Sequence, residues 1–308
     1  MPYFSIIIPV YNKETFIQNT LQSVLRQTFS DFEIVIINDG STDKSESIIL
    51  SFQDNRIRYF LKENEGVSSA RNLGIAKSNG QYICFLDADD YWYPNFLKTF
   101  YQYTLKFPEQ KVFSVAYEIE TSKKTFPAHY SIQKTNDYEL VNYFKASQKE
   151  SVLWTSSSCF HKAIFSTIGT FDPKIKSGQD TDLWIRIGLI HPILFIWNIQ
   201  ARYGYDPKSL SKNQSLLHEK MDFTKFSEQE KNNPELKFFL DLNRFSLAIK
   251  SKLQNDKILF STYYNAIDLK NLSFKKRLLL KMPSKILKAL ILLKTFLVNV
   301  GLGNSVFK

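Results

Sequence analysis

The chain has 308 residues, a formal net charge of +10 at neutral pH and 44% hydrophobic residues. This length is sufficient for one sizeable domain with an extension. The only two cysteines, Cys84 and Cys159, exclude a disulfide framework and show no zinc-site pattern, so we expect a reducing compartment and a cytoplasmic protein.

The first two predicted strands both end in polar residues. The first runs from Phe4 to Pro9 and is followed by Val10, Tyr11 and Asn12. Because it begins so early, we expect no secretion signal. The second covers residues 32–37 and leads into turn residues and acids at 38–43. Apolar residues at spacings of three and four predict a helix after each strand: Phe16, Thr20, Leu21, Val24 and Leu25, then Ile48, Ile49 and Phe52.

A third predicted strand, Tyr82 to Leu86, is followed directly by Asp87, Asp89 and Asp90. Carboxylates one residue apart at the end of a strand can share a hard divalent cation through oxygen ligands. Asp is also a common turn residue, and Asp90 is equally suited to capping the next helix. The second polar strand end, at residues 38–43, supports the metal interpretation, and a metal held there would bind phosphate.

Strands and helices alternate over the first hundred residues, which predicts βαβ units around a mostly parallel sheet. In open sheets of this kind ligands bind beyond the carboxyl ends of the strands. Tyr11, Asp39 and Asp87 all follow predicted strand ends. We therefore expect these three residues to line one crevice.

Four ordered segments resemble motifs of the family 2 glycosyltransferases: residues 6–12, 37–43, 64–72 and 87–90. The resemblance continues through residues 169–186 and covers roughly residues 4–211. It implies the GT-A fold, a Rossmann-like α/β fold with a mostly parallel sheet flanked by helices. It also implies an inverting, metal-dependent hexosyltransferase that uses Mn²⁺ or Mg²⁺. The expected donor is a UDP-sugar, and the expected acceptor is a hydroxyl of a glycan or lipid-linked molecule in cell-surface polysaccharide biosynthesis.

The resemblance assigns donor binding to residues of the first three segments. Asp39 would accept the N3 proton of uracil, since an ionised carboxylate is only an acceptor. Pro9 and Tyr11 would line the base pocket, Tyr11 with its aromatic face. Arg71 would steady either Asp39 or the diphosphate through its planar guanidinium, or it is an ordinary arginine on a helix surface.

The fourth segment supplies the phosphate end of the donor site. Asp87 would contact the ribose or the metal, Ala88 would lie in the donor-binding loop, and Asp89 would bind the metal that bridges the two phosphates. Asp206 stands where the family often carries a His. A carboxylate there is a suitable third metal ligand, or it begins an Asp-Pro turn. The predicted metal ligands are thus Asp87, Asp89 and Asp206.

The general base implied by the resemblance is Asp180. A carboxylate at a helix start is stabilised in its ionised form by the free amides and the helix dipole, although a helix cap would use the same residue. Gln179 replaces the acid that often precedes the base, which changes the acceptor contact. Trp154 either stacks on a pyranose ring or lies in the core, and Trp184 is expected to pack its helix.

Residues 1–215 are predicted to form the catalytic domain and residues 216–308 a basic helical extension. From residue 271 onward there are eight Lys or Arg residues and no Asp or Glu. The apolar stretch Ile286 to Val300 is interrupted by Lys288 and Lys294 and is shorter than the roughly 20 residues of a membrane span.

The final helix is expected to be basic and imperfectly amphipathic. Such a helix suits an anionic membrane surface, so we expect a peripheral protein at the inner face of the cell membrane. Alternatively, the helix packs on the catalytic domain and exposes its lysines to water. Nucleic acid is not an expected partner, because no nucleic-acid-binding fold or basic aromatic platform accompanies the charge.

Two other functions fit parts of the sequence. A catalytically inactive, nucleotide-binding membrane scaffold would result if the changes at Gln179 and Asp206 removed activity. A nucleotidyltransferase would share the sheet and the metal-held nucleotide. The second is disfavoured because the Gly-rich basic loop that such chemistry favours is missing near the first strand.

Overall fold

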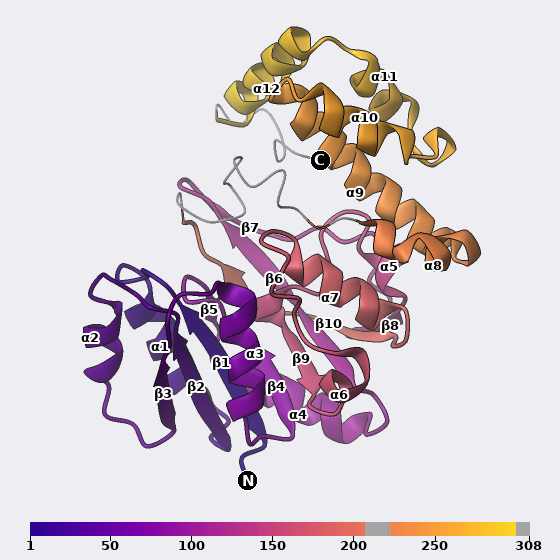
Figure 1. The fold of residues 1–308 in the computed structure, drawn as a ribbon. Helices are drawn as coiled ribbons and strands as arrows, with labels where there is room; N and C mark the ends of the chain where they lie inside the picture. The colour runs from indigo at the N-terminus through magenta and orange to yellow at the C-terminus, as the bar shows by residue number, and fades with distance from the viewer. Residues whose placement is uncertain (207–220, 222, 300–308) are drawn as a thin grey trace. The chain divides into compact units, whose positions relative to one another are not determined.

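The computed structural model describes residues 1–206, 221 and 223–299 (Figure 1). The chain divides into two compact units, residues 1–213 and residues 214–308, and each is described by itself. The predicted domain boundary between residues 215 and 216 lies outside the described residues.

The first unit is built on a ten-stranded sheet with the order β3-β2-β1-β4-β9-β6-β10-β5, in which β7 also pairs with β6 and β8 with β10. The strands are β1 (Phe4–Val10), β2 (Phe32–Asn38), β3 (Ile57–Leu61), β4 (Tyr82–Phe85), β5 (Tyr91–Trp92), β6 (Val112–Glu120), β7 (Thr125–Pro127), β8 (Tyr138–Val141), β9 (Ser158–His161) and β10 (Ile193–Tyr203). The predicted α/β class is confirmed.

Strands β1 to β4 form the parallel part of the sheet, because β1 pairs in parallel with β2 and β4, and β2 with β3. Val10 lies opposite Asn38, so β1 and β2 end at the same level. Every residue of β1, β2 and β4 is buried, which explains their continuous apolar sequences. The half-buried strand β3 was not predicted.

Helices cover this part of the sheet as the alternating pattern predicted. Helix α3 (Val67–Lys77) lies across β1 and β2 (Figure 1). At Gly74 a Cβ atom would come within 2.3 Å of Ile7 Cγ2, so only glycine permits this close approach. The other helices of the unit are α1 (Ile17–Leu25), α2 (Ser45–Leu50), α4 (Phe96–Lys106), α5 (Tyr143–Ala146), α6 (Ile164–Ile168) and α7 (Gln179–Gly188).

The rest of the sheet is mixed. Strand β9 runs antiparallel to both β4 and β6, whereas β10 is parallel to β6. Cys84 on β4 faces Cys159 on β9 in the strand register. Both are free thiols with no exposed surface.

The described part of the second unit is helical, as predicted. It contains α8 (Ser227–Asn232), α9 (Pro234–Leu253), α10 (Lys257–Asn265), α11 (Phe274–Lys281) and α12 (Ser284–Asn299). Side chains of Asn233, Asp256 and Ser273 cap α9, α10 and α11. Ala248 of α9 packs with Leu272 and Leu280 in a small core. Among the described residues, no helix combines the length and the apolar character needed to cross a membrane.

Candidate active site

The loops after β1 and β2 begin side by side. The Asp39 amide donates to the Val10 carbonyl over 2.8 Å. Pro9 is buried at the end of β1, and Tyr11 follows it with 48% of its surface exposed. Pro9, Tyr11 and Asp39, which are predicted to bind the uracil base, therefore come from two neighbouring strand ends.

The Asp39 carboxylate holds the loop that leads into α3. It accepts hydrogen bonds from Lys62 Nζ at 2.8 Å, from the Glu65 amide at 3.2 Å and from the Gly66 amide at 2.9 Å. Gly66 has a φ of 93°, a conformation that favours glycine. A carboxylate has about four acceptor positions, so three donors leave one for a ligand. Its contact with uracil stays a prediction.

Arg71 is buried on α3, with 4% of its surface exposed, so the alternative of a surface arginine is wrong. Its Nη2 donates to Asp87 Oδ1 at 2.5 Å, and its guanidinium lies 5.1 Å from the Phe171 ring centroid. Within the described part of the chain, Nε and Nη1 have no hydrogen-bond partner. The predicted pairing with Asp39 is not seen, since Lys62 takes that place. Two guanidinium donors thus remain for an anionic ligand.

The backbone of the acidic loop after β4 is held from two sides. Thr20 Oγ1, on α1, lies 2.9 Å from the carbonyl oxygens of both Ala88 and Asp90. On the other side the Asp87 amide donates to Ser156 Oγ at 3.0 Å. These contacts fix the loop while the Asp87 and Asp89 side chains keep part of their surface exposed.

Asp90 connects three segments of the first unit. Its Oδ1 accepts from the Gly204 amide at 2.9 Å, and its Oδ2 accepts from Ser156 Oγ at 2.5 Å. Burial, together with the charges of Asp89 and Asp87, raises the pKa of Asp90 well above its ordinary value. The alternative that Asp90 caps the next helix is wrong, because α4 follows Asn95 and has no side-chain cap.

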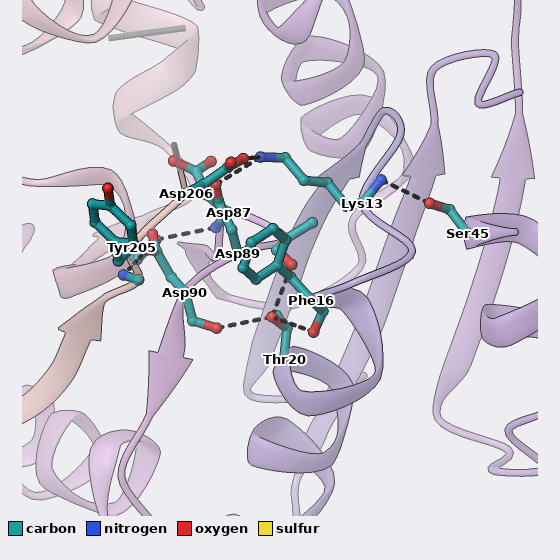
Figure 2. Close-up of polar contacts among 12 residues, drawn as sticks. Lys13, Phe16, Thr20, Ser45, Asp87, Asp89, Asp90, Tyr205 and Asp206 are labelled. Atoms are coloured by element: carbon teal, nitrogen blue, oxygen red, sulfur yellow. Dashed lines mark hydrogen bonds and ion pairs between the residues drawn. The ribbon is translucent and has the colours of Figure 1, made fainter. Parts of the chain in front are cut away.

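This connection brings the segment after β10 against the acidic loop. A Cβ atom at Gly204 would lie 1.8 Å from the Asp89 carbonyl oxygen, so the approach requires glycine. Two residues later Asp206, 6% exposed, lies beside Asp89 (Figure 2). Residue 207, the proline of the predicted Asp-Pro turn, lies outside the described residues.

Lys13, which the sequence analysis did not single out, bridges Asp89 and Asp206 (Figure 2). Its Nζ is 2.7 Å from Asp89 Oδ2 and 2.5 Å from Asp206 Oδ2. Burial alone lowers the pKa of Lys13, but the two carboxylates outweigh burial and raise it. Burial raises the pKa of Asp89 despite the opposing effect of Lys13. In the sequence, the signal that could have indicated this bridge was a lysine in the loop after β1.

Asp180 lies in the first turn of α7, as predicted, and its Oδ1 accepts from the Thr181 amide at 2.7 Å. Gly178, with a φ of 86°, precedes the helix at the N-cap position and gives it no side-chain cap. Asn72 exchanges two hydrogen bonds with the backbone of Phe171, at 2.8 and 3.0 Å. The segment before α7 is thereby fixed to α3, next to Arg71.

Gln179 directly precedes Asp180, the predicted general base. Within the described part of the chain, its Oε1 is buried and accepts no hydrogen bond. A buried amide oxygen without a donor is costly, so it is available to an acceptor hydroxyl.

The two tryptophans differ in surroundings. Trp184 is 2% exposed and stacks on Phe160 with centroids 5.2 Å apart, which confirms its predicted packing role. Trp154 is half-buried, with the rings of Tyr117 and Tyr203 at 4.7 and 5.4 Å. Trp154 thus belongs to an aromatic cluster beside Ser156, and its contact with a sugar stays a prediction.

Comparison with known proteins places this chain in one family. A family model described as glycosyl transferase family 2 matches residues 5–169. An uncharacterized glycosyltransferase of Rickettsia bellii is 39% identical over 199 residues, which cover 59% of this chain and 26% of the relative. An uncharacterized glycosyltransferase of Rickettsia typhi is 34% identical over 197 residues, which cover 63% of this chain and 61% of the relative. The chain thus matches only part of these relatives.

Among solved structures, S. aureus TarS superposes with a TM-score of 0.62 at 19% identity, covering 87% of this chain and 50% of TarS. The first unit therefore has the GT-A fold. The chain belongs to glycosyl transferase family 2.

Proposed function

We propose that the protein transfers a sugar, of hexose type, from a UDP-sugar to a hydroxyl of a glycan or lipid-linked acceptor, with inversion and with Mn²⁺ or Mg²⁺. The observation that carries this proposal is the pairing of two carboxylates, Asp89 after β4 and Asp206 after β10, through one shared cationic group. The choice of UDP is supported by S. aureus TarS, which has been crystallised with UDP and with UDP-GlcNAc. Cell-surface polysaccharide is the proposed product class.

In this proposal the donor lies along the ends of β1, β2 and β4. The uracil base of the donor binds between Pro9, Tyr11 and the remaining acceptor position of Asp39. The partly exposed carboxylate of Asp87 contacts the ribose, beside Ala88. Arg71 has two unpaired donors for the diphosphate, which suits a guanidinium because it forms charge-assisted hydrogen bonds with phosphate.

The two carboxylates of Asp89 and Asp206 suit a divalent metal ion that is bound together with substrate phosphates. Asp89 and Asp206 already share one cationic group, the Lys13 ammonium, through their Oδ2 atoms. Carboxylate oxygens suit Mg²⁺ and Mn²⁺, which typically take one or two carboxylates together with substrate phosphates. No group of three or more metal-ligand side chains occurs in the part of the chain that the structure describes. When bound, the ion would neutralise charge on the leaving diphosphate.

Asp180 is the proposed base. Its carboxylate lies in the first turn of α7, among the free amide groups of the helix N-terminus. The ionised group accepts the acceptor hydroxyl proton as that oxygen attacks the anomeric carbon. The buried Gln179 oxygen lies next to it in sequence and can orient the same hydroxyl.

The test begins with calorimetric binding of UDP, with GDP as control, in the presence and absence of Mn²⁺. We expect Mn²⁺-dependent UDP binding, after which UDP-sugars are screened against lipid-linked and glycan acceptors. Asp180→Asn should then reduce transfer by about 10³-fold or more while UDP affinity stays within about twofold. Asp172→Asn, a carboxylate change in the segment before α7, is the matched control. Near-native turnover in Asp180→Asn would refute the assignment of Asp180 as the general base. Failure of the native protein to bind UDP would refute the assignment of a UDP-sugar as the donor.

We also propose that the second unit binds the anionic inner face of the cell membrane. On α11, Phe274 and Leu278 are 76% and 44% exposed, adjacent to basic Lys275 and Arg277. Exposed apolar groups flanked by cations suit an anionic lipid surface. Binding to vesicles with about one-third anionic lipid should fall at high salt and after Phe274→Ser. Equal binding to neutral vesicles, or none to anionic ones, contradicts the proposal.

A further inference from the structure

The backbone around Lys13 is anchored on the loop that follows β2. The Lys13 amide donates to Ser45 Oγ at 2.8 Å, and Asn12 Oδ1 accepts from the Thr42 amide at 2.8 Å. Asn12 itself has a φ of 51°, a left-handed conformation that Asn tolerates better than most residues. With its backbone fixed on this side, the Lys13 side chain extends across to Asp89 and Asp206 (Figure 2).

The three charged groups of this bridge are largely removed from water. The side chains of Lys13, Asp89 and Asp206 are 21%, 16% and 7% exposed. Two partly desolvated carboxylates at one point repel each other unless a cation lies between them. Arg71 is paired with Asp87, so it does not take this position. The Lys13 ammonium lies between the Oδ2 atoms of Asp89 and Asp206, two of the proposed metal ligands.

We propose that Lys13 is a built-in cation that holds Asp89 and Asp206 together before a metal ion binds, and that the metal ion must displace its ammonium from these carboxylates. This inference rests on the metal-dependent function proposed above. The Oδ2 atoms that contact Lys13 belong to the two carboxylates proposed as metal ligands. Metal and ammonium therefore compete, and the intrinsic metal affinity of the protein is low.

The competition couples the metal to the donor. A diphosphate contributes oxygen ligands to the metal and gives the displaced ammonium a new anionic partner. Binding of one therefore favours binding of the other, as linkage requires. The protein would take up the metal with the nucleotide sugar rather than before it.

The test measures binding of Mn²⁺ alone, without nucleotide, by the electron paramagnetic resonance signal of free Mn²⁺. We expect Lys13→Met to bind Mn²⁺ at least about tenfold more tightly than the native protein, because the competing cation is gone. Lys13→Arg keeps the charge and should stay close to native. Lys62→Met is the matched control, since Lys62 also bridges two carboxylates, Asp39 and Glu65. Its Mn²⁺ affinity should change by less than about twofold.

A second variant and a second measurement separate the possible outcomes. Adding Asp206→Asn to Lys13→Met should remove the gain, and a gain that persists would place the competition elsewhere and overturn the inference. In thermal unfolding without metal, Lys13→Met should melt lower and recover on adding Mn²⁺. A loss of stability with unchanged Mn²⁺ affinity means a purely structural lysine and also overturns it.

The proposed function can fail separately. Unchanged Mn²⁺ affinity in Lys13→Met, combined with Mn²⁺-dependent UDP binding in the native protein, refutes only the role of Lys13. Absence of Mn²⁺ binding in every variant, with and without UDP, refutes both the role of Lys13 and the metal dependence.

Discussion

Two lysines of the first unit each bridge two carboxylates, and the two bridges differ in reach and burial. Lys62 joins Asp39 to Glu65, which is only three residues away in sequence and has 64% of its side chain exposed. Lys13 joins Asp89 to Asp206, from loops 117 residues apart, and both carboxylates are largely buried. The difference in burial indicates that the Lys13 bridge depends on its cation more than the Lys62 bridge does.

In the Lys62 bridge, water can replace the lysine at Glu65, and backbone amides already hold Asp39. In the Lys13 bridge, the exposed surface is small, so a cation is needed to keep the two acids together. The proposed nucleotide-base end of the site is therefore held by backbone amides, while the proposed phosphate end is held by charge. Changes at the two ends should accordingly have unequal effects.

The largest effect is expected for Asp89→Ala, which removes one carboxylate of the Lys13 bridge. It should abolish the Mn²⁺ dependence of UDP binding and reduce transfer by about 10³-fold, because the leaving diphosphate loses electrostatic stabilisation. Calorimetry and an initial-rate assay would measure the two losses. Retained Mn²⁺ dependence would show that the metal binds elsewhere.

Gly204→Ala should destabilise the first unit by about 3 kcal/mol, since its Cβ would overlap the Asp89 carbonyl and must push the chain apart. Gly66→Ala, at the Lys62 bridge, is the matched change. It meets no atom within 4 Å and only strains the backbone, so we expect about 1 kcal/mol. Urea unfolding of the two variants gives the comparison. Equal costs would contradict the close contact at Gly204.

Glu33, a buried carboxylate on β2 outside both bridges, separates burial from ligand binding. Burial alone raises its pKa, but hydrogen bonds from Ser5, Asn79 and Arg58 outweigh burial and lower the pKa below its ordinary value. The resulting stability is present above the unfolded pKa of about 4.3 and is lost as pH falls through the lower folded pKa. Glu33→Gln should therefore cost about 2 kcal/mol at pH 7.

Urea unfolding of Glu33→Gln and native protein at several pH values checks this sign. The difference between them should shrink below pH of about 4, where the native carboxylate takes up its proton. A difference that is constant with pH would mean that packing, not charge, carries the effect.

The smallest effect is expected for Glu65→Gln, which weakens the exposed side of the Lys62 bridge. UDP affinity should change by less than about twofold, because exposed ion pairs contribute little and Asp39 keeps its amide donors. Calorimetry under the conditions used for Asp89→Ala provides the measurement. A loss comparable to that of Asp89→Ala would remove the distinction between the two bridges.

Much of the first half of the fold could be predicted because its strands are buried on both faces. The apolar runs of β1, β2 and β4 are visible in the sequence, and each ends in a polar motif. The half-buried β3 has no comparable run, and the antiparallel insertion of β9 between β4 and β6 depends on pairings distant in sequence. Periodicity reports burial, not which strand lies beside which.

The site shows the same limit. Asp39, Asp87 and Asp89 could be singled out as candidates because they follow strand ends in recognisable motifs. Lys13 was missed because its two partners lie 76 and 193 residues away, and a lysine in a polar loop resembles any exposed lysine. The role of Asp90 as a connector depends likewise on Gly204, 114 residues further on.

The facing thiols of Cys84 and Cys159 provide a reporter of sheet opening. They sit on β4 and β9, where the parallel part of the sheet joins the mixed part, and neither has exposed surface. A thiol-modifying reagent can reach them only when these strands separate. The rate of modification in the native protein therefore measures how often the two halves of the sheet come apart, and a bound donor that bridges β1, β2 and β4 should slow it.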